Sequence, residues 1–297
     1  MRSRFRPSTV LGTTGTATLS LLALLHTGAT ARGEDAASAV PIPNVYLDLR
    51  TTVSTLPAGA ISIGLGNTNL AAILRNLAAF SGRPGTSPAS QSVVVDFPLT
   101  ADFDRVSFYG GISASASHNN VSGWQEFEVT SWNVGFQADL YRQDGGALPT
   151  LTWQSTITRS LSTPLAATSA FTNILEANYA LDADETRGLL AGLQTVHVLA
   201  DSSLVHVNPS VVGYVGGYYQ WPNNWKVTAR VGIQSFGGAQ LLSLPQFSSF
   251  TQPVVRFDLD RMDDDDNRLY GLTAQIAWVT KPAYQLVFRT PLSLSQN

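Results

Sequence analysis

The sequence predicts an all-β protein, an antiparallel transmembrane β-barrel of about twelve strands. Apolar and polar residues alternate along many segments, as they do in strands that bury one face. Charged residues make up 13% of the chain, about half the share of ~25% usual in soluble domains. Mean hydropathy is only +0.05, and the longest apolar run, Leu19–Leu25, is far shorter than the ~20 residues of a membrane helix. A disordered chain and a bundle of membrane helices are therefore excluded.

Residues 1–31 are interpreted as a secretory signal peptide. Three arginines precede residue 7, Leu19–Leu25 supplies the apolar region, and Ala29–Ala31 has the small residues of a cleavage site. An amphipathic first helix is the alternative, which the Gly and Thr residues before Leu19 disfavour.

The expected organisation is a signal at 1–31, a periplasmic segment at 32–44 and a barrel at 45–297. The formal charge of −3 for the whole chain, which becomes more negative without the signal arginines, offers no basic surface for nucleic acid. The chain has no cysteine, so disulfides and thiolate metal sites are excluded.

The strands follow from the alternation, taken in chain order. They are predicted at 45–55, 91–99, 105–117, 128–141, 149–160, 171–181, 187–199, 209–220, 224–236, 254–261, 268–280 and 283–290. In the first of them Val45, Leu47 and Leu49 alternate with Asp48 and Arg50. The later strands repeat this pattern, except that 187–199 and 209–220 carry apolar residues on both faces. Many of these strands have the ~9–11 residues needed to cross a bilayer, whereas strands of soluble proteins are usually shorter.

A thirteenth alternating segment, 60–66, is assigned to the first external loop, because an even strand number leaves both chain ends on one side. Short polar turns are expected at Thr100–Asp104, Gln143–Ala147, Asp182–Thr186, Trp221–Asn224 and Met262–Asn267, and longer links at 117–127, 160–170, 200–208 and 237–253. Short periplasmic turns and long external loops are typical of outer-membrane barrels.

The first loop, about 56–90, contains one helical segment, Asn69–Phe80. Its apolar stripe consists of Leu70, Ile73, Leu74 and Leu77. Such a stripe must be buried, either as a plug helix in the lumen or on the barrel rim, and the sequence leaves both open.

The strand pattern assigns each side chain to a face. Phe108, Trp132, Phe136, Trp153, Val231, Phe257 and Trp278 are expected to face lipid, and the aromatics Trp132, Tyr141, Trp153, Tyr179, Trp225, Trp278 and Tyr284 to form interfacial girdles. The lumen is expected to be lined by Asp48, Arg50, Asp96, Arg105, Glu128, Asp139, Glu176, Lys226, Arg230, Arg256, Asp258 and Arg289, besides uncharged residues such as Gln154. Both charge signs occur, which fits either a small polar pore or a closed, salt-bridged interior.

With this pattern the chain resembles bacterial outer-membrane β-barrel proteins of the small channel-like, porin-like class of Gram-negative bacteria. The resemblance implies a location in the cell outer membrane, with membrane lipid and the barrel-assembly machinery as partners. Members commonly end with an aromatic residue in the last strand. Here the candidate, Phe288 of Tyr284–Phe288, is followed by nine further residues, which is a departure from that pattern.

Other chemistry finds little support, and we expect no catalytic residue, cofactor or metal. His118, His197 and His206 are scattered. An enzyme of the outer-membrane phospholipase kind would need Ser, His and Asn on the outer wall, but His118 lies in a predicted loop and no Gly-x-Ser-x-Gly occurs.

Two segments resemble ligand loops only superficially. The acidic run Asp258–Asp266 lacks the glycine and closing glutamate of a calcium loop. The glycine-rich run Val211–Tyr219 has no lysine and no following helix, both of which a phosphate cradle requires.

The function expected is therefore a passive or gated channel for small polar solutes. A structural or surface-binding barrel with a filled lumen is the main alternative, followed by a secreted soluble β-protein and a barrel enzyme.

Overall fold

In a computed structural model the described residues are 43–57, 89–119, 123–143, 145–161, 167–202, 205–241, 248–264, 267–278 and 281–295. They belong to one compact unit within Pro41–Asn297. The predicted signal, the strand-like segment 60–66 and the helix predicted at 69–80 lie outside the described residues.

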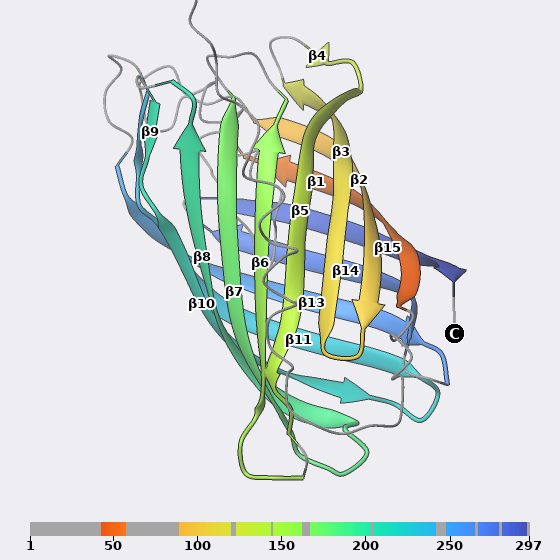
Figure 1. Cartoon of the computed structure of the whole chain (residues 1–297). Helices are drawn as coiled ribbons and strands as arrows, with labels where there is room; N and C mark the ends of the chain where they lie inside the picture. Colours follow the sequence, from red (N-terminus) through yellow and green to blue (C-terminus); the bar gives the residue numbers. More distant parts are fainter. Residues whose placement is uncertain are drawn as a thin grey trace, which may run out of the picture. The chain divides into compact units, whose positions relative to one another are not determined.

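Twelve long antiparallel strands make up the described structure (Figure 1). They are β1 Asn44–Leu56, β2 Ser90–Phe103, β3 Val106–Asn119, β5 Glu128–Tyr141, β6 Thr150–Ser160, β7 Thr168–Ala180, β8 Arg187–Ala200, β10 Ser210–Gln220, β11 Trp225–Phe236, β13 Phe250–Met262, β14 Arg268–Trp278 and β15 Pro282–Ser295. Three short strands lie near one end: β4 Gly123–Trp124 extends the edge of β3, and β9 Val205–Val207 pairs with β12 Ala239–Leu241. The predicted all-β fold of twelve main strands is confirmed.

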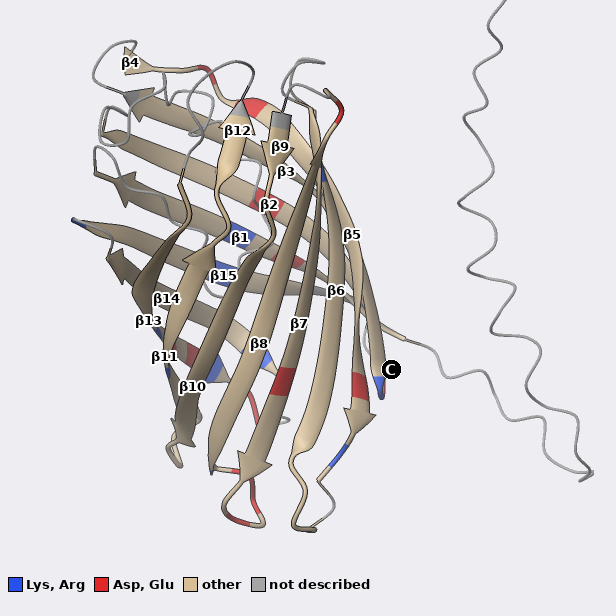
Figure 2. Ribbon diagram, turned by 90° about the vertical axis from the view of Figure 1, so that its left-hand side faces the viewer, with Lys and Arg blue, Asp and Glu red and all other residues tan. Residues whose placement is uncertain are grey.

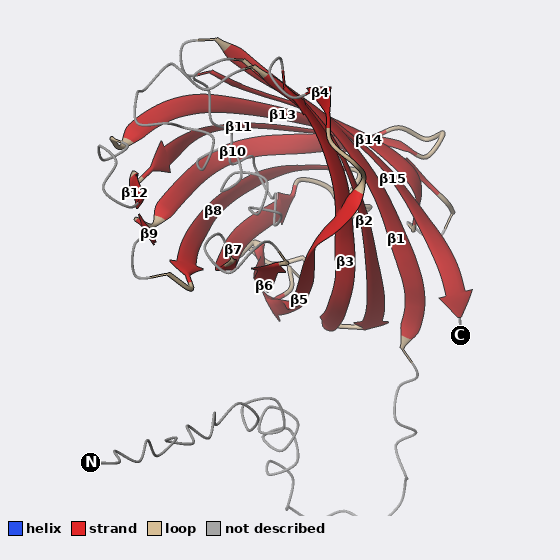
Figure 3. Cartoon of the chain, turned by 90° about the horizontal axis from the view of Figure 1, so that it is seen from above, coloured by secondary structure: helices blue, strands red, loops and turns tan. Residues whose placement is uncertain are grey.

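The sheet closes on itself, as Figure 3 shows from above. β1 pairs with β15 from Thr55–Tyr284 to Val45–Ser295, and with β2 on its other side. The pairing of β2 with β3 completes the ring. The predicted closure of the first strand on the last is confirmed, so no long strand leaves a row of unpaired backbone groups.

Several strand boundaries differ from the expectation: β13 begins at Phe250 rather than 254 and β7 at Thr168 rather than 171, and two strands end later than expected. β2 continues through Thr100 to Phe103, so the turn shrinks to Asp104 and Arg105, and Arg105 does not lie on the inner face of a strand. The reason is that Phe103 pairs with Val106 and its ring packs edge-on against Phe108, with 6.2 Å between centroids. β15 runs to Ser295 rather than to 290, because its last residues pair with the start of β1.

The two surfaces of the wall differ in polarity. The side chains expected to face lipid, such as Phe108, Trp132 and Phe257, are exposed on the outside. Along the strands, charged residues occur only at isolated positions (Figure 2). Among the described residues, no helix is long and apolar enough to cross a membrane.

Inside the wall, tyrosine rings lie flat over glycines of the neighbouring strand. Tyr109 is directly opposite Gly135, and a Cβ on that glycine would lie 2.6 Å from the ring. Tyr214 covers Gly192 in the same way, and a Cβ there would overlap its ring. The missing side chain lets a large ring lie along the wall instead of filling the lumen.

Candidate functional site: the barrel lumen

The lumen contains two polar cavities of about 500 Å³ and about 230 Å³. The larger lies against β1, β2, β5, β6, β7, β10, β11, β13, β14 and β15, and the smaller against β1, β2, β3, β5, β6 and β15. Five side chains line both cavities, namely Arg50, Asp96, Gln137, Gln154 and Arg289. The two spaces therefore adjoin at this group, which we call the junction.

Charged side chains gather on one wall. At the seam, Arg50 of β1 and Arg289 of β15 are directly opposite in the strand register. Both bind Asp48, which lies two residues before Arg50 on the same face. The Arg50 Nε donates to Asp48 Oδ2 over 2.8 Å. Like charges placed directly opposite repel, and the carboxylate of Asp48 offsets the repulsion between these two guanidinium groups.

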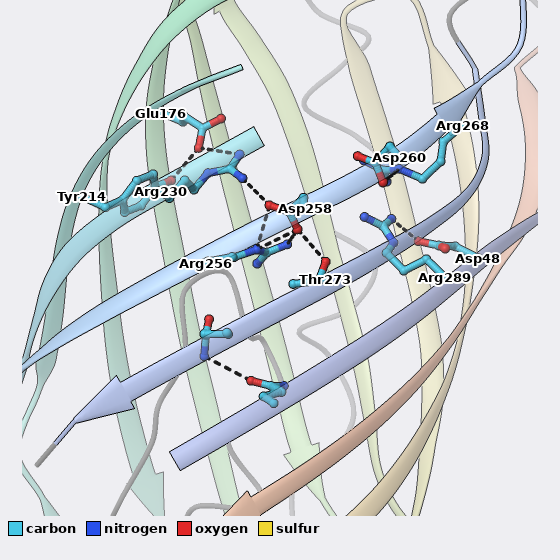
Figure 4. Close-up of polar contacts among 12 residues, drawn as sticks. Asp48, Glu176, Tyr214, Arg230, Arg256, Asp258, Asp260, Arg268, Thr273 and Arg289 are labelled. Carbon is cyan, nitrogen blue, oxygen red and sulfur yellow. Dashed lines mark hydrogen bonds and ion pairs between the residues drawn. The ribbon is translucent and has the colours of Figure 1, made fainter. Parts of the chain in front are cut away.

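A second cluster repeats the arrangement on β11 and β13 (Figure 4). Arg230 and Arg256 are directly opposite, and Asp258 lies two residues after Arg256. Asp258 accepts from Arg230 Nη1 and from Arg256 Nη2, each over 2.7 Å, and from the Thr273 hydroxyl over 2.5 Å. All of these groups point into the barrel in Figure 4.

Glu176 connects this cluster to β7 and β10. Its Oε2 accepts a hydrogen bond from the Tyr214 hydroxyl over 2.7 Å and lies 3.5 Å from Arg230 Nη2. A separate pair, Arg268 of β14 and Asp260 of β13, is 2.8 Å apart and lies next to Asp48 and Arg289 in Figure 4. A continuous ionic surface thus covers the wall from β11 through β15 to β1.

The facing wall is polar but uncharged. The Tyr109 hydroxyl lies 2.5 Å from Thr156 Oγ1 and accepts from Gln154 Nε2 over 2.8 Å. Gln137 and Thr152 continue this surface along β5 and β6. A solute in the lumen would therefore meet charges on one side and neutral hydrogen-bonding groups on the other.

The structure separates the predicted lumen residues into two groups. Asp48, Arg50, Asp96, Glu176, Arg230, Arg256, Asp258 and Arg289 line the cavities. Arg105, Glu128, Asp139 and Lys226 line neither. Lys226 Nζ instead lies 4.5 Å from the centre of the Tyr218 ring, and Glu128 is exposed opposite Ser115.

Asp139 belongs to an ionic group at the short-turn end of the barrel. Its Oδ2 accepts from Arg142 Nε over 2.8 Å, and Arg142 Nη1 donates to Asp104 over 2.7 Å. The hydrogen bonds that Arg142 donates to Asp104 and Asp139 raise the pKa of Arg142. The group joins the end of β5 to the β2–β3 turn.

Arg268 lines the larger cavity, although it is not among the residues predicted to line the lumen. By simple alternation it would lie on the same face as Tyr270 and Leu272, which are exposed outside. The pairing skips one residue there, from Arg261–Tyr270 to Met262–Arg268, and this irregularity turns Arg268 inward. Tyr109 follows the outward-facing Phe108, so alternation alone puts its side chain inside, but its contact with Gly135 depends on the strand register.

No group of three or more His, Asp or Glu side chains that could hold a metal ion is found among the described residues.

The sequence matches no protein-family model and no curated protein. Solved structures do match. An outer membrane channel from Pseudomonas putida F1 is 10% identical, with a TM-score of 0.53 over 88% of this chain and 100% of that one. The transport unit of the autotransporter AIDA-I from Escherichia coli is 11% identical, with a TM-score of 0.49 over 85% and 90%. At these identities the likeness concerns the fold alone: this chain has the fold of bacterial outer-membrane β-barrels.

Proposed function

We propose that this protein is a passive or gated outer-membrane channel for small polar solutes. The observation that carries the proposal is the lumen itself, because the cavities of about 500 Å³ and about 230 Å³ adjoin at the junction. A barrel of eight strands is just filled by its side chains, whereas one of sixteen holds water. Twelve strands lie between these cases, so the unfilled volume is what favours a channel.

The lining supports the same function. Nearly all side chains around the cavities are polar or charged, as in water-filled barrels. The larger ones are held by ion pairs along the wall, as Arg230 and Arg256 are by Asp258, so they do not collapse into the space. Placement in the outer membrane is part of this proposal and is supported by the apolar outer surface.

Single-channel recording in planar bilayers tests the proposal. The folded full-length protein should produce discrete conductance steps, and Gln137→Trp should reduce them strongly, because Gln137 belongs to the junction and is exposed to its space. Val134→Trp is the matched control. Val134 lies on the same strand but is 48% exposed on the outside, so its conductance should equal that of the wild type.

One result would overturn the channel, and another would overturn the route through the junction. If folded protein conducts nothing, the barrel is a structural or surface-binding one with a closed lumen. If Gln137→Trp and Val134→Trp conduct like the wild type, ions do not pass through the junction.

A further inference from the structure

On the charged wall the aspartates are buried, and the arginines that bind them are partly exposed. The side chains of Asp48, Asp258 and Asp260 are only 1%, 8% and 9% exposed. The arginines that bind them are 19–35% exposed, from Arg230 to Arg50. Formal charges along the wall nearly balance, but the layer that a solute touches is made mainly of guanidinium groups.

The strand register explains this layering. In each cluster two arginines are directly opposite across neighbouring strands, and one aspartate lies two residues along on one of them. The short aspartate stays at the wall, while the long arginine side chains extend over it into the cavity. The carboxylates of Asp48 and Asp258 are thus each shared between two guanidinium groups.

Two partly exposed acids of the larger cavity, Glu176 and Asp96, offset only part of the charge of the five arginines. The Glu176 oxygen nearest the cluster already accepts from Tyr214 and lies next to Arg230. Asp96 is directly opposite Arg50 in the register. Asp102, in the smaller cavity, accepts a hydrogen bond of 2.5 Å from Ser107.

We infer that the arginine surface of Arg50, Arg230, Arg256, Arg268 and Arg289 is a binding surface for small oxyanions, carboxylates or phosphates, that pass through the lumen. Planar guanidinium groups match the paired oxygens of these anions, and rings of arginine favour anions in pores. The neutral wall of Gln137, Gln154 and Thr152 would bind the uncharged end of such a solute. The inference rests on the proposed channel function and adds its substrate class.

The first test is the reversal potential of single channels in a KCl gradient. The wild type should favour chloride over potassium. The double variant Arg50→Gln/Arg230→Gln should lower the chloride-to-potassium permeability ratio about twofold or more. Each buried aspartate keeps one arginine in this variant, Arg289 for Asp48 and Arg256 for Asp258, so the barrel should still fold, which its circular dichroism spectrum checks.

Two controls distinguish the loss of positive charge from a general disturbance of the barrel structure. Arg50→Lys/Arg230→Lys keeps both charges and should keep the selectivity. Lys226→Gln removes a positive charge from β11 that lines neither cavity, and it should leave the permeability ratio unchanged.

The second test needs no conduction. Inorganic phosphate is titrated into the detergent-solubilised protein in a calorimeter. The wild type should bind it and Arg50→Gln/Arg230→Gln should bind it at least about tenfold more weakly, a loss of about 1.4 kcal/mol.

The outcomes distinguish the two proposals. Phosphate binding without any conductance would overturn the channel and keep the anion surface. Conductance that prefers potassium, together with no phosphate binding, would overturn the anion surface and keep the channel. Equal selectivity in the wild type and in Arg50→Gln/Arg230→Gln would also overturn it.

Discussion

Single residues shape the lumen through close contacts between neighbouring strands. Tyr214 is held on three sides: its ring covers Gly192, its Cβ lies against Gly232, and its hydroxyl donates to Glu176 over 2.7 Å. The ring therefore positions the carboxylate that approaches Arg230. A glycine on β8 thus influences a charge on β11, two strands away in the sheet order.

Gly192→Ala should lower the free energy of unfolding by about 1–3 kcal/mol, the usual cost of overpacking. The new Cβ would overlap the Tyr214 ring, so the ring must move and its hydrogen bond to Glu176 must weaken. Urea unfolding in lipid vesicles, followed by tryptophan fluorescence, measures the change.

Gly213→Ala is the control for this prediction, because a Cβ on Gly213 would meet no atom within 4 Å. Its unfolding should match that of the wild type. In a Tyr214→Ala background the cost of Gly192→Ala should disappear. A cost that persists there would show that the ring contact is not its cause.

At the scale of strands, the prolines show where the sheet tolerates a missing N–H group. Pro98, Pro253, Pro282 and Pro291 all lie within strands, and each has a partner on one side only. At Pro98 the β1–β2 ladder is interrupted between Leu47–Leu99 and Arg50–Asp96. This is the usual confinement of proline to unpaired edges, found here within a closed barrel.

Val255→Pro should abolish or strongly impair folding, whereas Thr251→Pro should be tolerated. Both residues lie an even number of positions from Pro253 on β13, so their N–H groups point to the same side as its ring nitrogen. Val255 has Ile276 of β14 on its second side, but Thr251 lies beyond the end of the β13–β14 ladder.

An unpaired backbone group inside a bilayer costs several kcal/mol, which is the physical reason for this contrast. The measurement is the folded fraction recovered in vesicles, by circular dichroism. Equal folding of the two variants would show that the β13–β14 ladder does not extend to Val255.

The features of the sheet that depend only on the alternation of apolar and polar residues were predicted correctly from the sequence. The twelve strands, the seam between β1 and β15, and the outward position of Phe257 next to Arg256 all follow from strict alternation. Arg268 does not, because one skipped residue reverses its face. The sharing of an aspartate between two arginines could not be predicted either. Arg50 and Arg289 are 239 residues apart in the sequence, and only the strand register shows that they are directly opposite.

At the scale of the whole molecule, apolar side chains lie on the outside and polar side chains in the interior, the reverse of a soluble protein. Apolar side chains such as Leu286, Phe288 and Val231 are about half exposed on the outer surface, while arginines and aspartates line the interior. In water such an outer surface would be unfavourable, because exposed apolar patches of soluble proteins are small. The distribution is favourable only where the outer wall contacts lipid and the inner wall contacts water.

An arginine introduced at either of two exposed apolar positions tests whether the outer wall contacts lipid. Phe288→Arg should lower the free energy of unfolding in vesicles by about 2–4 kcal/mol, because Phe288 is 51% exposed in the middle of β15 and a charge there meets hydrocarbon. Leu148→Arg should cost only about 0–1 kcal/mol, since Leu148 is 61% exposed but lies in the short link between β5 and β6. Urea unfolding in vesicles compares both variants with the wild type. Equally small costs would mean that the outer wall faces water, and the chain would then be a soluble β-protein with a polar interior.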